Sequence, residues 1–377
     1  MNLALRDIAH APARFLLTTC SVAFLMLAVI GMLGLYKGVM ADALMVLNRV
    51  DADLWIVQGG TKGPIAEVSS VPRNVTGRVD AVQGVAWARG FTQFDYQITH
   101  KGRQDRATIL GLDVPRDDGS WITLAAGRLL TTTRYEAIAD KSLHLALGEA
   151  VQLGRDSYRI VGVADGMVDT AGDGLVFVGM GDALDILSTR TSEDILLTRA
   201  AEPGATGRPA ISAVLAGLTP GADPDTVRAR IEGWGDVSVL SQEEQRVLTL
   251  SYRLGKLRAQ LLAFTGLILI VTCIVVSLIM YSMTVEKLHE IATLKLLGAR
   301  NAVIAGLIGQ QALLMGLAGY GVGVAVSLSV LPYFPRRVIV DLPTLAWLSL
   351  ALLAICLVAS WVGIARAMKV DAREVLS

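Results

Sequence analysis

The sequence predicts an α-helical membrane protein with four transmembrane spans and a large mixed α+β extracytoplasmic domain inserted between spans 1 and 2. Three observations predict this fold class. Apolar residues make up 53% of the 377 residues and the mean hydropathy is +0.52, which exceeds the usual composition of a soluble domain. Four runs lack charge for long enough to cross about 30 Å of hydrocarbon. A long segment of mixed composition separates the first run from the second.

The four uncharged runs define the predicted spans. They cover residues 15–36, 259–285, 301–331 and 342–365. Residues 1–14 are expected to lie along the membrane surface, because Leu3, Leu5 and Ile8 stand among polar residues. Span 1 is longer than the roughly 7 to 15 apolar residues of a signal peptide, so we expect it to be retained in the protein.

Lysine and arginine in the short segments predict the orientation. Residues 1–14, 286–300 and 366–377 carry eight of them, whereas the loop of residues 332–341 has only Arg336 and Arg337. Because positive charge is enriched on the cytoplasmic side, we expect both termini and residues 286–300 in the cytoplasm. Residues 37–258 are then extracytoplasmic. The formal net charge is +0, which gives no reason to expect nucleic-acid binding.

The external segment begins and ends with predicted stalk helices. The helical pattern of span 1 continues through Met40, Leu44 and Leu47. Between the stalks, strands are predicted at residues 53–57, 93–99, 107–112, 158–163 and 175–178. Helices are predicted at residues 74–82, 141–147 and 224–232.

The second stalk is predicted to begin at Ser241. Glu244 follows three residues later, which is the spacing of a capping box. Leu248, Tyr252, Leu257 and Leu261 then predict an apolar stripe that continues into span 2.

Residues 286–300 form a charged amphipathic segment between spans 2 and 3. Its polar side chains include Glu286, Lys287, His289, Glu290 and Lys295. Apolar side chains at helical spacing are Ile291, Leu294, Leu297 and Val303. The spacing predicts one apolar face that docks on a partner, with Gly298 ending the helix. The alternative is a solvated connector.

Small residues in span 3 predict close helix packing. Gly316, Gly319 and Gly323 recur at intervals that allow backbones to approach in lipid. We expect them to pack against spans 2 and 4 of the same subunit, and a dimer contact is the alternative.

Sequence motifs give no support for catalysis in this chain. A phosphate-binding G-x-x-x-x-G-K-[ST] loop is absent, so ATP-driven work requires a separate subunit. The four histidines are scattered and no G-x-S-x-G nucleophile motif occurs. We therefore expect a non-catalytic subunit without a metal or cofactor of its own. An enzyme with its active site in the external segment is the disfavoured alternative.

The chain resembles ABC-transporter permeases of the MacB and FtsX superfamily. Residues 290–299, EIATLKLLGA, are similar to a signature that follows span 2 in that family. Residues 135–140, 148–153 and 160–163 resemble its periplasmic core, and residues 371–376 resemble its terminal element. Residues 51–57 and 109–113 are most like the DevC-type branch.

The resemblance implies a homodimer that works with a cytoplasmic ABC ATPase dimer, which binds MgATP. A periplasmic adaptor and an outer-membrane channel often complete such complexes. The resemblance further implies efflux by mechanotransmission, in which closure of the ATPases moves the stalks and external domains. The predicted ATPase-coupling residues are Glu286, Glu290, Ile291, Leu294, Lys295, Leu297, Gly298 and Arg300.

The cargo and its binding residues are not identified by the sequence. Uncharged spans favour a hydrophobic or amphiphilic substrate. Two other functions stay open: FtsX-like signalling to an external cell-wall hydrolase, and extraction of lipid or lipoprotein from the outer leaflet.

Overall fold

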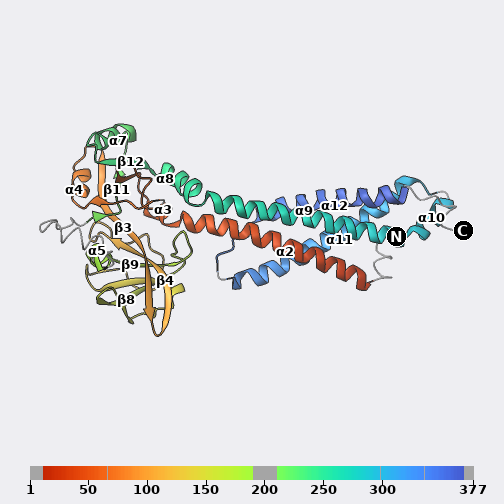
Figure 1. Ribbon diagram of the computed structural model, residues 1–377, viewed down its shortest axis with the longest axis horizontal. Helices are drawn as coiled ribbons and strands as arrows, with labels where there is room; N and C mark the ends of the chain where they lie inside the picture. The colour runs from red at the N-terminus through yellow and green to blue at the C-terminus, as the bar shows by residue number, and fades with distance from the viewer. Residues whose placement is uncertain (1–11, 66, 190–209, 298, 335, 369–377) are drawn as a thin grey trace, which may run out of the picture. The chain divides into compact units, whose positions relative to one another are not determined.

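The computed structural model describes residues 12–65, 67–189, 210–297, 299–334 and 336–368 (Figure 1). The chain forms two compact units. One, the helical unit, comprises Met1–Gly38 and Lys256–Ser377, and the other, the sheet unit, comprises Val39–Gly255. The predicted segments 1–14 and 366–377 lie largely outside the described residues.

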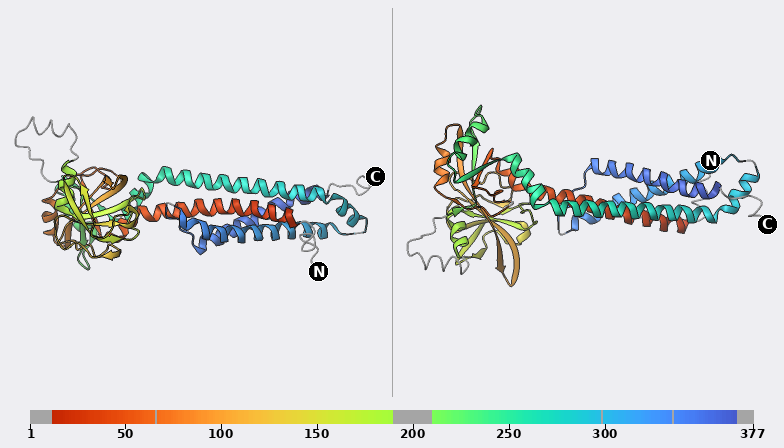
Figure 2. Two further views of the ribbon diagram at one scale, coloured as in Figure 1. Left: turned by 90° about the horizontal axis from the view of Figure 1, so that it is seen from below. Right: turned by 45° about the horizontal axis from the view of Figure 1, so that its top comes forward.

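The helical unit is built from long helices that lie side by side in every view (Figures 1 and 2). The helices are α2 (Pro12–Ala43), α9 (Gly255–Glu286), α10 (Leu288–Leu296), α11 (Asn301–Val330), η3 (Leu331–Tyr333) and α12 (Leu342–Met368). Four of them, α2, α9, α11 and α12, are long and apolar enough to cross a membrane. The four predicted spans lie within these helices or end one residue beyond them.

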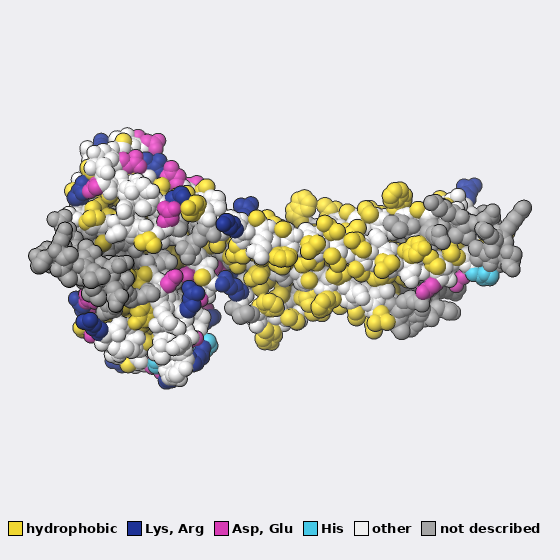
Figure 3. Space-filling view, viewed as in Figure 1, with side chains coloured by type: hydrophobic (Ala, Val, Ile, Leu, Met, Phe, Trp, Pro, Cys, Tyr) yellow, Lys and Arg dark blue, Asp and Glu magenta, His cyan; other side chains and the backbone are white. Residues whose placement is uncertain are grey.

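The core of the helical unit joins side chains from all four long helices. Met26 of α2, Met280 of α9, Met315 of α11 and Cys356 of α12 belong to one buried cluster. Apolar side chains also cover much of the outer surface (Figure 3), as a surface that faces lipid requires. Several buried hydroxyls are satisfied within their own helix, for example Thr284, whose Oγ1 donates to the Met280 carbonyl at 2.7 Å.

The sheet unit contains a ten-stranded sheet in the order β12-β1-β11-β3-β4-β9-β6-β8-β5, with β7 beside β8. Its strands are β1 (Leu54–Gln58), β3 (Val85–His100), β4 (Arg103–Leu112), β5 (Leu124–Gly127), β6 (Glu136–Asp140), β7 (Ala150–Leu153), β8 (Asp156–Ala164), β9 (Gly174–Gly179), β11 (Ala213–Leu218) and β12 (Val237–Ser241). Strands β2 (Val71–Pro72) and β10 (Ala210–Ile211) pair separately. All pairs are antiparallel except β4 with β9 and β6 with β8.

Both faces of the central strands are buried. Leu110 of β4 and Phe177 of β9 pack in one cluster, whereas Ile109 and Val176 pack in another on the opposite face. This division follows from the two-residue period of a strand. The five predicted strands are confirmed, each within one residue of an observed strand or inside it.

Short helices complete the sheet unit. They are α3 (Met45–Val50), α4 (Val75–Asp80), η1 (Lys141–Leu143), α5 (Met180–Thr189), α7 (Pro224–Glu232), α8 (Gln242–Leu248) and η2 (Thr249–Arg253). The predicted helix at residues 224–232 is confirmed. The predicted helix at residues 141–147 is wrong: only one 3₁₀ turn forms, because His144 adopts a left-handed conformation with φ of 56°.

The second stalk begins as predicted but does not continue as one α-helix. The capping box between Ser241 and Glu244 is present. After α8 the chain makes a π-turn, in which the Leu254 N–H donates to the Thr249 carbonyl at 3.2 Å. A π-turn accommodates an extra residue and rotates the side chains after it about the helix axis. Tyr252 within this turn is 57% exposed and Leu257 after it is 38% exposed, so the predicted uninterrupted stripe is wrong.

Candidate functional site

The segment between spans 2 and 3 folds as a separate short helix. Helix α9 ends at Glu286, and Lys287 departs from helical geometry with φ of −95° and ψ of 10°. Helix α10 then covers nine residues. Glu290 lies in its first turn, where a carboxylate interacts favourably with the helix dipole.

Backbone hydrogen bonds define the end of α10. The Leu297 N–H donates to the Thr293 carbonyl at 3.1 Å, and the Ala299 N–H donates to the Leu294 carbonyl at 3.0 Å. The second bond spans six residues, as in a Schellman motif. Gly298, the predicted stop, lies outside the described residues.

The apolar residues of this segment do not share one face. Ile291 is 3% exposed and packs in the core of the helical unit, whereas Leu297 is 80% exposed. Val303 belongs to α11 and is 57% exposed. The prediction of one face is wrong because α10 ends at Leu296, so later residues do not keep its 3.6-residue period.

Two neighbouring leucines form an exposed apolar end on α10, which we call the leucine tip. Leu296 is 61% exposed and Leu297 is 80% exposed. Leu297 is among the coupling residues predicted from the sequence, whereas Leu296 is not. No local signal marked Leu296 as exposed, because consecutive helix residues can both be buried in one core, as Val29 and Ile30 of α2 are.

Charged residues tie α10 to the helical unit. Lys295 Nζ donates to the carbonyl of Met368, near the end of α12, at 3.4 Å. Positive charge at a helix C-terminus is stabilising. Burial lowers the pKa of Lys287, and the nearby Glu290 carboxylate partly opposes that shift. These contacts make α10 part of the packed helical unit.

The remaining predicted coupling residues lie around α10. Glu286, at the end of α9, and Arg300, which precedes α11, are exposed. Glu290 is also exposed, whereas Leu294 and Lys295 are half-buried. The segment thus exposes Glu286, Glu290, the leucine tip and Arg300 at the surface of the helical unit. Ile291 is buried in the core of that unit.

The glycines of α11 lie against neighbouring helices of the same chain. A Cβ at Gly319 would approach Val22 Cγ1 of α2 to 2.6 Å, and one at Gly323 would approach Met26 Cβ of α2 to 2.9 Å. Gly316 faces Cys356 of α12. The expected contact of these glycines with span 2 is therefore wrong, since their neighbours are spans 1 and 4.

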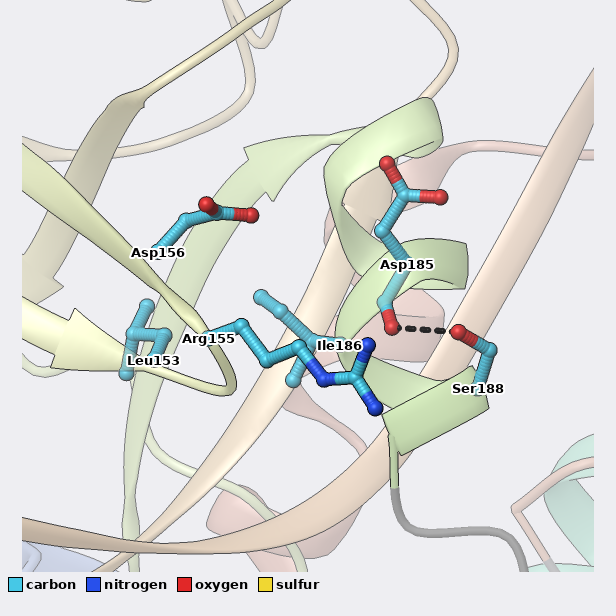
Figure 4. Close-up of a pocket in the computed structure, with 6 residues that line it drawn as sticks. All are labelled: Leu153, Arg155, Asp156, Asp185, Ile186 and Ser188. Carbon is cyan, nitrogen blue, oxygen red and sulfur yellow. Dashed lines mark hydrogen bonds between the residues drawn. The ribbon is translucent and has the colours of Figure 1, made fainter.

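The sheet unit has a pocket of about 230 Å³ beside the turn between β7 and β8 (Figure 4). Its lining residues are Leu153, Arg155, Asp156, Asp185, Ile186 and Ser188. The Ser188 hydroxyl donates to the Asp185 carbonyl at 2.7 Å and so acts as a structural group. Within the described ranges, no group of three or more His, Cys, Asp or Glu residues is placed to hold a metal. The pocket therefore presents no recognisable catalytic arrangement.

Comparison with known proteins identifies two family matches along the chain. Residues 15–234 match the MacB-like periplasmic core domain, and residues 262–372 match the FtsX-like permease C-terminal domain. Two uncharacterised ABC transporter permeases of Mycobacterium tuberculosis are similar over 98% of this chain and 97% of their own length. They are 23% identical over 371 residues and 24% identical over 370 residues.

Two solved structures are similar to about half of the chain. The periplasmic region of MacB from Actinobacillus actinomycetemcomitans is 12% identical, with a TM-score of 0.38 over 51% of this chain and 90% of that region. The extracellular domain of the transporter YknZ from Gram-positive bacteria is 15% identical, with a TM-score of 0.35 over 50% of this chain and 99% of that domain.

Four apolar helices with a sheet domain between the first and second fit a multi-pass membrane protein. With a family match over more than half of its length, the chain belongs to the MacB/FtsX-type ABC transporter permeases. This family comprises generally non-catalytic membrane subunits and implies an ATPase partner. The predicted family and fold class are confirmed, and the narrower DevC-type assignment stays a prediction.

Proposed function

We propose that this chain is the permease subunit of an ATP-driven export complex that works by mechanotransmission. In this proposal a cytoplasmic ABC ATPase binds the leucine tip of α10 and moves α9. The movement passes along the chain through the π-turn and α8 to the external sheet unit. The observation that carries the proposal is that α10 follows α9 after the single residue Lys287 and exposes its apolar end.

The contacts of α10 support transmission of force. A docking element must expose side chains to its partner and also be fixed to the part that it moves. Leu296 and Leu297 supply the exposed apolar surface, which is typical of protein contacts. Ile291, buried among the long helices, and Lys295, bonded to the end of α12, supply the attachment.

The proposed assembly is a homodimer in the bacterial inner membrane with α10 in the cytoplasm and the sheet unit in the periplasm. The lysine and arginine distribution supports this orientation. The proposed cargo is hydrophobic or amphiphilic, because residues 259–285, 301–331 and 342–365 contain no charged side chain. A periplasmic adaptor and an outer-membrane channel would complete the export route.

The docking step is tested by copurification of the full chain with its ATPase from the native membrane. We expect Leu297→Glu to reduce recovery of the ATPase at least tenfold, because a carboxylate would enter an apolar contact. Leu147→Glu is the matched control, since Leu147 is 52% exposed in the sheet unit. Equal ATPase recovery with both variants would overturn the proposed docking site. The purified chain alone should hydrolyse no ATP, and turnover by it would contradict the non-catalytic assignment.

A further inference from the structure

The outer end of α2 carries glycines against which another segment of the helical unit packs. A Cβ at Gly34 would lie 2.5 Å from Val338 Cγ1, and a Cβ at Gly38 would overlap the Arg337 carbonyl oxygen. Gly34 and Gly38 are one helical turn apart and therefore share one side of α2. The loop between α11 and α12 thus lies directly on the α2 backbone.

Polar contacts hold the same loop to α2. The Ile339 N–H donates to the Gly34 carbonyl at 3.0 Å. One turn later, Lys37 Nζ lies 2.8 Å from both carboxylate oxygens of Asp341. A charge-assisted pair with two oxygens is stronger than a neutral hydrogen bond. Backbone, side-chain and charge contacts therefore coincide on one face of α2.

Asp341 links the loop to α12. Its carboxylate accepts a hydrogen bond from the Thr344 hydroxyl, and its carbonyl accepts one from the Leu345 N–H at 3.1 Å. The Lys37 ammonium and the Thr344 hydroxyl lower the pKa of Asp341, so its carboxylate is charged at neutral pH. Tyr320 of α11 donates its hydroxyl to the Leu345 carbonyl at 2.6 Å. Helices α2 and α11 are consequently both bonded to the beginning of α12 or to the residue before it.

Helix α9 is the least enclosed of the four long helices. Of its most apolar stretch, 17% is buried, compared with 33% in α2, 28% in α11 and 35% in α12. A helix with fewer packed neighbours can shift at a lower free-energy cost. The four helices therefore divide into a connected group of three and one that is less constrained.

We infer that residues 336–341 form a strap that fixes the outer end of α2 to α11 and α12. The strap makes α2 a static anchor, and α9 carries the movement that ATP drives. This inference rests on the proposed function, because it assigns different roles to the two helices through which force could leave the membrane.

Amide hydrogen exchange of the full chain with its ATPase tests the strap. In the wild type, the peptide that contains Ile339 should exchange slowly, to the same extent with and without ATP. Lys37→Ala and Asp341→Ala should speed its exchange at least tenfold. The double variant with Lys37→Asp and Asp341→Lys should restore slow exchange, which also guards against variants that merely fail to fold. Arg336→Ala, an exposed charge in the same loop, is the control and should change little.

Gly38→Ala is a second test of the strap. A strap predicts that this variant has a lower melting temperature, whereas an ordinary helix surface predicts a higher one. Alanine stabilises an ordinary helix relative to glycine. Here its methyl group would displace Arg337, so the strap predicts faster exchange at Ile339 and a lower melting temperature. A higher melting temperature with unchanged exchange would overturn the strap.

The role of the strap in transmission needs a second readout. We expect ATP to change exchange in residues 242–254 of the wild type, and Lys37→Ala to reduce that change at least threefold while ATP hydrolysis continues. An unaltered ATP response in Lys37→Ala would overturn the anchoring role, although the proposed function would stand. The absence of an ATP response in the wild type would instead contradict the proposed function, whatever the exchange of the strap.

Discussion

Helices α2 and α9 both lead from the helical unit toward the sheet unit along the chain, yet they are held differently. Helix α2 packs against Gly319 and Gly323 of α11. Its own Gly34 and Gly38 contact the α11–α12 loop, and its Lys37 pairs with Asp341. Helix α9 is mostly exposed, leads directly to α10 and is preceded by a π-turn. This difference in packing, between two helices of similar composition, is the basis for proposing that α2 is the anchor and that α9 moves.

The continuation of each helix in the sheet unit shows a related contrast. Helix α3, which follows α2, ends at Val50, whose carbonyl accepts a hydrogen bond from Arg89 of β3. Arg89 also pairs with the buried Asp117 at 3.4 Å. Helix α8, which precedes the π-turn, contacts α3 through Gln242, whose Nε2 lies 3.4 Å from the Leu47 carbonyl. The α2 side thus ends on a buried charge pair. The α9 side ends on this neutral contact and on a more exposed ion pair between Arg228 and Glu244.

The largest effect on stability is expected when the charge pair between Arg89 and Asp117 is removed. Arg89→Ala should lower the free energy of unfolding of the sheet unit by about 3 kcal/mol, because it leaves Asp117 buried without its cation. Chemical denaturation followed by tryptophan fluorescence measures the change. Arg89→Lys should recover part of the loss, since it keeps the charge. A loss below about 1 kcal/mol in Arg89→Ala would remove the contrast between the two sides.

Overpacking of α11 against α2 is the next largest effect. Gly323→Val should destabilise the helical unit by about 2 kcal/mol, because a Cβ there already lies within 3.0 Å of the Ala23 carbonyl oxygen. Thermal unfolding in detergent measures the change. Gly321→Val is the matched control, since a Cβ at Gly321 meets no atom within 4 Å. Similar melting temperatures for the two variants would contradict tight packing of α2.

A smaller effect is expected at the start of the second stalk. Ser241→Ala should cost about 1 kcal/mol, because it removes the side chain that accepts the Glu244 N–H at 3.2 Å. Local hydrogen exchange in α8 should rise about fivefold in proportion. If exchange in α8 does not change, the capping box is not what keeps this helix folded.

The smallest effect concerns acid stability of the sheet unit. Hydrogen bonds from Lys101, the Ala146 N–H and His100 lower the pKa of Glu149 to about 2. Because the folded pKa lies below the unfolded one, the stabilisation is complete above pH about 4.5 and is lost as pH falls toward 2. In Glu149→Gln, the free energy of unfolding should change less with pH between these values than it does in the wild type. A curve that keeps the wild-type slope would show that Glu149 does not contribute.

The sequence predicted the features that arise from local pattern. Uncharged runs indicated the four spans, clusters of Gly, Asp and Pro bounded the five strands, and the spacing of Ser241 and Glu244 indicated the capping box. Each depends on neighbours within one element, so a single sequence contains the signal.

The features that the sequence did not reveal depend on contacts between distant residues. Lys37 and Asp341 are separated by 304 positions, and nothing local shows that they meet. The glycine spacing predicted close packing of α11, but the identity of its neighbour, α2, is a property of the tertiary fold. To predict that Ile291 is buried and Leu297 is exposed, one must know where α10 ends. Helix boundaries are the least certain part of a sequence prediction.

The central claim is that the ATPase contacts the leucine tip of α10. Its most direct measurement places a photoactivatable amino acid at Leu297 of the full chain in its native membrane and identifies the adducts by mass spectrometry. We predict a covalent adduct with the ABC ATPase from Leu297 and none from Leu147, the exposed leucine of the sheet unit. Adducts with lipid alone from Leu297, or equal ATPase adducts from both positions, would contradict the claim.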